Sequence, residues 1–151
     1  MALVYIGLGT NLGDKESNLI DAILKLSLEV GTVICQSSFY TSKPMGYVSE
    51  NEFINAVVLL ETNFPPLDLL IKTQEIERKQ GRTTKSTAGY SDRLIDIDIL
   101  LYDNLIIDQP TLTIPHPLLT ERNFVLIPLS EIAPELIHPV LGRRIIDLLS
   151  I

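Results

Sequence analysis

Apolar residues occur along the chain in short runs that glycine, proline and polar residues separate. The first run, residues 3–8, ends at Gly9 and predicts a strand. Asp14 can cap a helix, and apolar side chains then recur at positions 19, 22, 23 and 26. This spacing predicts an amphipathic helix that ends at Gly31.

The strand and helix patterns then occur a second time. Residues 32–40 and 53–60 are rich in β-branched and aromatic side chains, which favour strands. A Pro-Pro pair suits the start of a helix, which we expect over residues 67–80. Residues 93–102, with the sequence RLIDIDILLY, predict a further strand.

The rest of the chain predicts smaller elements. Residues 105–107 follow a turn signal, and we expect them to pair back as a hairpin. Residues 125–132 predict a helix, and residues 144–149 a short last one. The core order is strand, helix, strand, strand, helix, strand, which indicates one α+β domain over residues 1–151. We expect a ferredoxin-like α/β sandwich, an antiparallel sheet with two helices packed on one face.

Charge narrows the classes of ligand. The 151 residues have a formal net charge of -7, so we expect no general attraction to nucleic acid or to anionic membranes. An anionic ligand must therefore be held by a local cluster of cations or by bound metal. Cys35 is the single cysteine, which excludes an intramolecular disulfide and favours a reducing cytoplasm. No apolar stretch approaches the roughly 20 residues that a membrane span needs.

Asp96 and Asp98 are the sharpest chemical signal. In a strand, residues two apart point to the same face, so these carboxylates project together about 6.5–7 Å apart at their Cα atoms. Aspartate is disfavoured in strands, and two in so apolar a run need a reason. A pair of carboxylates suits Mg²⁺, which also takes water and substrate phosphate. The alternative is a half-exposed strand that presents carboxylates to water.

Positive groups flank this pair in the sequence. Arg82, Lys85 and Arg93 precede it, and His116 and Arg122 follow it. Carboxylates that hold a metal beside arginines that hold phosphate oxygens would suit a metal–polyphosphate ligand. A set of solvated surface charges is the alternative for any one arginine.

Two further features suggest a flat ligand and a buried contact. Phe53 and Phe124 could sandwich a planar ring while Asn55 binds its edge, although core packing explains either ring alone. On the helix over residues 67–80, the stripe that begins at Leu67 and Leu70 turns polar at Gln74 and Glu77. Such a change indicates either a buried partner or a helix end that reaches solvent. The opening GLGTNLG lacks the third glycine of a dinucleotide loop and the Gly-Lys-Ser/Thr of a P-loop.

Taken together, these motifs resemble the 6-hydroxymethyl-7,8-dihydropterin pyrophosphokinase family. The resemblance runs from Tyr5 to about Pro139 through YIGLGTNLGD, SSFYTSKPMG, FINAVVLLET, TQEIERKQGR, RLIDIDILLY and the segment from IPHPLL to IHP. It implies a cytoplasmic enzyme of folate biosynthesis that uses Mg²⁺ and transfers pyrophosphate from ATP to the pterin hydroxymethyl group. ATP and the pterin would be its partners, and we expect a monomer.

The resemblance also implies roles for individual residues. Asp96 and Asp98 match ligands of two Mg²⁺ ions, and Arg82 and Arg93 match arginines of a mobile catalytic loop. The identity of the general base stays open between a carboxylate and metal coordination alone. The positions that match the nucleotide side are Gln74, Ile99, Thr113, His116 and Arg122, and those that match the pterin side are Ser42, Met45, Phe53, Asn55 and Phe124.

The chain also departs from the family pattern in places. Thr84 stands where many members have a second loop arginine, with Lys85 beside it. We expect Tyr90 to replace a loop aromatic, and Asp92 adjoins Arg93. Pro117 replaces a ring after the phosphate histidine, and Phe53 stands where many members have tyrosine. Two alternatives are a non-catalytic regulator that binds pterin or nucleotide on the same fold, and a ferredoxin-like module that only mediates interactions.

Overall fold

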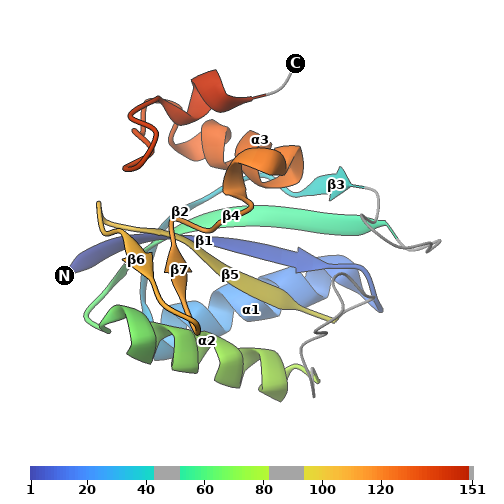
Figure 1. The fold of residues 1–151 in the computed structure, drawn as a ribbon. Coiled ribbons are helices and arrows are strands. Elements are labelled where there is room, and N and C mark those ends of the chain that lie inside the picture. Colours follow the sequence, from blue (N-terminus) through green and yellow to red (C-terminus); the bar gives the residue numbers. More distant parts are fainter. Residues whose placement is uncertain (43–51, 82–93, 150–151) are drawn as a thin grey trace.

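The computed structural model describes residues 1–42, 52–81 and 94–149. The chain runs from β1 through α1 and β2 into the paired strands β3 and β4, and then through α2 into β5 (Figure 1). Smaller elements follow. The bounds are β1 Ala2–Thr10, α1 Lys15–Glu29, β2 Gly31–Gln36, β3 Tyr40–Ser42, β4 Phe53–Thr62, α2 Pro66–Lys79, β5 Asp96–Tyr102, β6 Ile107–Asp108, β7 Thr113–Ile114, η1 Leu119–Glu121, α3 Asn123–Ile132 and η2 Ile145–Leu148.

The main sheet has five strands among the described residues, and every pairing in it is antiparallel. Its order is β2-β4-β1-β5, with β3 also paired to β4. β1 and β4, which are the central strands, run side by side from Ala2↔Thr62 to Thr10↔Ile54. With one helix after β1 and another after β4, this is the order of the ferredoxin-like βαββαβ unit. The predicted fold class is therefore confirmed.

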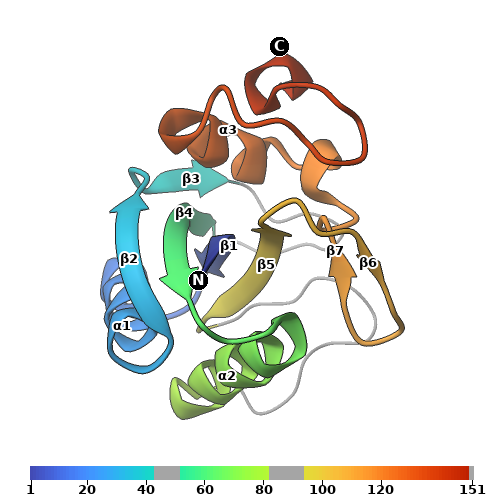
Figure 2. The same cartoon turned by 90° about the vertical axis from the view of Figure 1, so that its left-hand side faces the viewer.

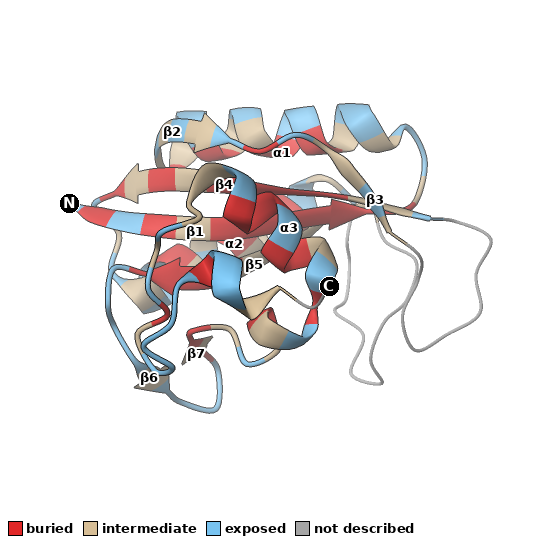
Figure 3. Cartoon of the chain, turned by 90° about the horizontal axis from the view of Figure 1, so that it is seen from above, coloured by how far each residue is buried: buried red, intermediate tan, exposed pale blue. Residues whose placement is uncertain are grey.

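Helices cover both faces of the sheet. α1 and α2 lie on one face and α3 lies on the other, as Figure 2 shows. One apolar cluster fills the space between the sheet and α1 and α2, and includes Val4, Leu19 and Leu69. A second cluster, with Leu100 and Leu126, lies between the sheet and α3. The central strands are mostly buried between these layers (Figure 3), which makes them a rigid base for side chains near their ends.

Local signals in the sequence set the helix ends. Asp14 caps α1, because its carboxylate accepts a hydrogen bond from the Ser17 N–H. α2 begins at Pro66, where the missing N–H costs nothing, and stops before Gly81, whose φ of 103° favours glycine. Among the described residues, none of the helices has the length and apolarity required to cross a bilayer.

Three predicted elements differ from the structure. The strand predicted over residues 32–40 is split into β2 and β3 at Ser37, whose hydroxyl accepts the Val57 N–H in place of a ladder carbonyl. The segment 105–107 does not pair back on β5, because β6 pairs with β7 instead. The last helix is a single 3₁₀ turn, in which the Asp147 N–H donates to the Arg144 carbonyl three residues earlier.

Candidate active site

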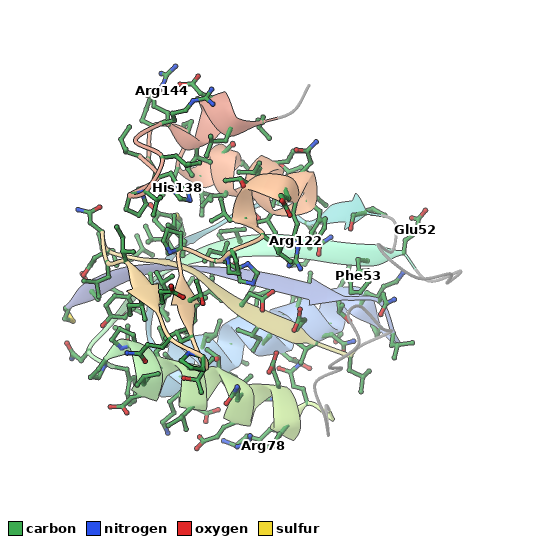
Figure 4. The ribbon with its side chains drawn as sticks, in the orientation of Figure 1. Glu52, Phe53, Arg78, Arg122, His138 and Arg144 are labelled. Carbon is green, nitrogen blue, oxygen red and sulfur yellow. The ribbon has the colours of Figure 1, made fainter. Side chains whose placement is uncertain are left out.

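A pocket opens where the ends of β1, β4 and β5 meet the start of α3. Its volume is about 590 Å³, including the open mouth. Figure 4 places Arg122 at the start of α3, above the sheet, and Phe53 at the start of β4. The lining residues are Gly7, Leu8, Gly9, Ser42, Phe53, Asn55, Ala56, Val57, Asp96, Asp98, Leu100, Arg122, Phe124 and Val125.

One part of the wall combines aromatic rings with a fixed amide. Phe53 comes from β4 and Phe124 from the first turn of α3. Asn55 is only 5% exposed, and its Nδ2 donates to Ser42 Oγ at 2.6 Å. Because this bond uses the amide as a donor, the orientation of the Asn55 side chain is set before any ligand binds. The arrangement suits a flat heterocycle whose edge has donors and acceptors.

Asp96 and Asp98 form the opposite, acidic part of the wall. They share one face of β5, while Ile95 and Ile97 point into the core between the sheet and the helices. This confirms the alternation expected of the strand. On β1, the register partners of Asp96 and Asp98 are Gly9 and Gly7. Since glycine has no side chain, β1 adds no side chain of its own beside the carboxylates, and Leu100 and Asn55 pack against the two glycines instead.

Two cationic or protonatable groups face Asp98. His116 Nε2 lies 4.0 Å from Asp98 Oδ1, and an Arg122 terminal nitrogen lies 3.9 Å from Oδ2. His116 Nδ1 accepts the Leu118 N–H at 3.2 Å, so in neutral imidazole the proton is on Nε2, which faces Asp98. The structure therefore brings His116 and Arg122, two of the five predicted basic groups, close to Asp98, while Arg82, Lys85 and Arg93 lie outside the described residues.

Arg122 is nine-tenths buried and links the two parts of the pocket. Its guanidinium carbon lies 5.6 Å from the centroid of the Phe124 ring, and the same group approaches Asp98. Burial lowers the pKa of Arg122 to about 10. The group is still cationic at neutral pH, and its charge lies in a poorly hydrated place where an anionic ligand would gain most from it.

The acidic wall also fits a hard divalent cation. Over residues 1–42, 52–81 and 94–149, no group of three or more His, Cys, Asp or Glu side chains could hold a metal by itself. Mg²⁺ is commonly bound by one or two carboxylates, with water and substrate phosphates as its other ligands. Asp96 and Asp98 are half-buried and line the pocket, so they can supply the carboxylate ligands of such an ion.

The structure gathers half of the predicted site residues in the pocket. These are Ser42, Phe53, Asn55, Asp96, Asp98, Arg122 and Phe124, and His116 lies next to Asp98. Three others lie outside its lining: Gln74 on α2, Thr113 on β7, and Ile99, which is 5% exposed in the core. Their predicted places on the nucleotide side stay predictions. Arg82, Arg93 and Met45, like Lys85 and Tyr90, lie outside the described residues.

Two features of the site differ from or go beyond the sequence pattern. The stripe predicted on α2 is wrong at Leu67, which is 45% exposed, because the buried face consists of Leu69, Thr73, Ile76 and Glu77. Gly7 and Gly9 of β1 line the pocket, although the sequence motif that contains them assigns them no site. Their spacing of two, which places both opposite the aspartates, is the signal that could have assigned them to the pocket.

Comparisons with known proteins identify the family of the chain. The family model for 7,8-dihydro-6-hydroxymethylpterin-pyrophosphokinase matches residues 5–134. A Porphyromonas gingivalis protein named 2-amino-4-hydroxy-6-hydroxymethyldihydropteridine pyrophosphokinase is 48% identical over 141 residues, which cover 92% of this chain and 95% of that protein. A protein of the same name from Aquifex aeolicus is 42% identical, over 93% of this chain and 86% of its own length.

Similar domains also occur inside longer chains. A crystal structure of Plasmodium falciparum HPPK-DHPS with pteroate matches 97% of this chain with a TM-score of 0.79. The sequence identity there is 19% and the match spans 41% of that longer chain, so this likeness shows the fold alone. The extent of the family match and the identity to full-length relatives show that the chain belongs to the 7,8-dihydro-6-hydroxymethylpterin-pyrophosphokinase family.

Proposed function

We propose that the chain transfers the β,γ-pyrophosphoryl group of ATP to the hydroxymethyl group of 6-hydroxymethyl-7,8-dihydropterin. The hydroxyl oxygen bonds to the β-phosphorus while the bond from that phosphorus to the oxygen shared with the α-phosphorus breaks. The products are the pterin pyrophosphate and AMP, and the hydroxyl proton is released. One observation carries the proposal: the rings and amide suited to a pterin share a pocket with the two carboxylates.

The pterin binds, in this proposal, between Phe53 and Phe124. Stacking on two rings favours a flat heterocycle, and Asn55 hydrogen-bonds its edge. The Ser42 contact supports this assignment, because it holds the Asn55 amide in one orientation. Met45 completes the pterin side. The hydroxymethyl group then points along the pocket towards Asp96 and Asp98.

We assign Asp96 and Asp98 as the residues that hold two Mg²⁺ ions with ATP. When bound, these ions offset the negative charge of the transferring group. The pair of aspartates has the oxygen chemistry and open space that Mg²⁺ needs. Holding ATP and pterin in line is the other contribution of the chain, because positioning supplies much of catalysis in phosphoryl transfer.

The cations around the pocket bind the phosphates. Arg122 offers a buried guanidinium, and His116 directs Nε2 to the same region. Arg82 and Arg93, which follow α2 in the sequence, serve as catalytic residues. Gln74, Ile99 and Thr113 contact the nucleoside. We also propose a monomer in the cytoplasm, which is what the family resemblance implies.

The experiment that tests the proposal measures AMP formation from ATP and Mg²⁺ with and without the pterin. AMP that depends on the pterin, with no free phosphate, is the expected result. Tight binding of the pterin without AMP would contradict catalysis and support a binding protein instead. That outcome would direct attention to the loop departures at Thr84 and Asp92.

A further inference from the structure

Glu77 is a buried acidic residue of α2 that lies outside the pocket lining. It is 4% exposed, and its Oε2 accepts the Ile97 N–H of β5 at 2.8 Å. This contact joins the last full turn of α2 to the strand that contains both aspartates. The sequence left open whether Glu77 has a buried partner or reaches solvent. The structure shows that it is buried and that one partner is the main-chain amide of Ile97.

The contact has a specific position in β5. Ile97 lies between Asp96 and Asp98, so the peptide group that donates to Glu77 is the one that connects Asp96 to Ile97. On one side, β5 pairs with β1 at Leu8↔Ile97. The Ile97 N–H points away from that ladder, where a strand at the edge of a sheet otherwise needs another acceptor.

A second contact fixes β5 on the same side, just beyond Asp98. The His116 N–H donates to the Leu100 carbonyl at 2.9 Å. The two bonds flank Asp98, one before it in the strand and one after it. Together with the pairing to β1, they restrict the rotation of the peptide groups that determine where the two carboxylates point.

Burying a carboxyl group is costly. Moving such a group out of water costs several kcal/mol if it is charged, so its oxygens need hydrogen-bond donors, and the Ile97 N–H is one of them. An apolar side chain of similar size would suit packing under the sheet at least as well. The position therefore indicates a role for the carboxyl oxygen itself beyond filling space.

We propose that Glu77 is a positioning residue that fixes the main chain between Asp96 and Asp98 and so sets the affinity of the site for metal–ATP. The inference rests on the proposed function, since it assigns the aspartates to metal. Outer-shell groups that orient metal ligands commonly change metal affinity or activity by about 10- to 100-fold when they are removed.

A matched pair of variants tests the role. Glu77→Gln keeps the shape and keeps an oxygen that can accept the Ile97 N–H, whereas Glu77→Met keeps the size and has no such oxygen. We expect Glu77→Met to raise the half-saturating Mg²⁺ concentration for AMP formation about tenfold. We expect the half-saturating Mg²⁺ concentration of Glu77→Gln to match that of the unchanged protein. The amide hydrogen of Ile97 should exchange with solvent faster in Glu77→Met only.

The control is Thr73→Val, one turn earlier on the same buried face of α2. Thr73 donates to the Leu70 carbonyl within its own helix, so this variant perturbs the helix without touching that contact to β5. We expect its Mg²⁺ response to be unchanged. Either of two results would overturn the proposal: an unchanged Mg²⁺ response in folded Glu77→Met, or a response in Glu77→Gln that is shifted about tenfold.

A binding measurement separates this proposal from the proposed function. Calorimetry with Mn²⁺ and α,β-methylene ATP reports metal–nucleotide affinity without turnover. If the unchanged protein binds this probe but forms no AMP from ATP and the pterin, the proposed pyrophosphoryl transfer is contradicted. That result leaves the role of Glu77 untouched. Weaker binding in Glu77→Met than in Glu77→Gln would still support the role of Glu77, and equal binding in the two variants would overturn it.

Discussion

The backbone of Gly9 passes so close to Asn55 that a β-carbon at position 9 would lie 2.9 Å from Asn55 Oδ1. The two residues are register partners on β1 and β4. Real β-carbons essentially never come that close to a neighbour, so any side chain at position 9 would have to displace the amide. Glycine at this position thus makes room for the group assigned to the edge of the pterin.

This relationship predicts that Gly9→Ala weakens pterin binding while the fold persists. The displaced amide loses its hydrogen bonds to the ligand, which are worth about 1–3 kcal/mol, so affinity should fall roughly tenfold to a hundredfold. Calorimetric titration with the pterin measures the change. ATP affinity should differ little.

A double-mutant cycle checks the physical reason. In an Asn55→Ala background the methyl group at position 9 has space, so adding Gly9→Ala should cost much less than it does alone. If the two losses simply added, the effect of Gly9 would not act through Asn55, and the predicted contact would be irrelevant to binding.

Asp98 is predicted to be essential for turnover. Asp98→Ala removes a carboxylate that we assign to metal and that faces His116 and Arg122. Turnover should fall by several orders of magnitude with an unchanged circular dichroism spectrum. Asp108→Ala, at an exposed position of β6, is the matched control and should retain full activity. Near-normal turnover in the purified Asp98 variant would refute the metal assignment.

The ring of Phe53 should contribute through stacking alone. Phe53→Tyr keeps the aromatic face and should bind pterin nearly as well as the unchanged protein. Phe53→Leu should weaken binding about two- to tenfold, in line with a loss of about 0.5–1.5 kcal/mol of ring interaction. Phe64→Leu, which changes a ring packed against the core near Lys72, is the control for general loss of aromatic volume. Equal affinity of Phe53→Leu and Phe53→Tyr would argue against a pterin on this face.

His138 predicts a dependence of stability on pH. Burial lowers its pKa, and its Nδ1 accepts the N–H groups of Val140 and Leu141. The folded state therefore binds fewer protons than the unfolded state below the ordinary pKa of about 6.5, and stability falls as pH decreases from there towards the folded pKa. His138→Asn keeps an acceptor that does not titrate. Thermal melts at pH 7 and pH 5 should show a smaller loss for this variant, and equal losses would contradict the assignment.

The sequence predicted strand faces correctly where apolar and polar residues alternate regularly. The alternation in RLIDIDILLY placed Asp96 and Asp98 together and the isoleucines in the core, as the structure confirms. The break at Ser37 could not be predicted, because it depends on a hydroxyl that bonds Val57 on a strand 20 residues later. The β6–β7 pairing is equally non-local and involves only two residues on each strand.

The composition of the site could also be predicted largely from the sequence. Its rings, amide, carboxylates and cations were identified from their types and from the family resemblance, and eight of the predicted residues lie in or beside the pocket. The prediction of the buried face of α2 was wrong at Leu67, because the helix buries Leu69 and Thr73 and leaves Leu67 exposed. The contact from Glu77 to Ile97 joins a side chain to a main-chain group, which no pattern of side chains reveals.

The most direct test of the central claim follows the β-phosphorus of ATP. ATP labelled at that atom is incubated with the protein, Mg²⁺ and 6-hydroxymethyl-7,8-dihydropterin, and the products are separated. The account predicts that the label moves to the pterin product and that the AMP is unlabelled. Label that stays on the nucleotide as ADP would mean transfer of a single phosphoryl group and would contradict pyrophosphoryl transfer.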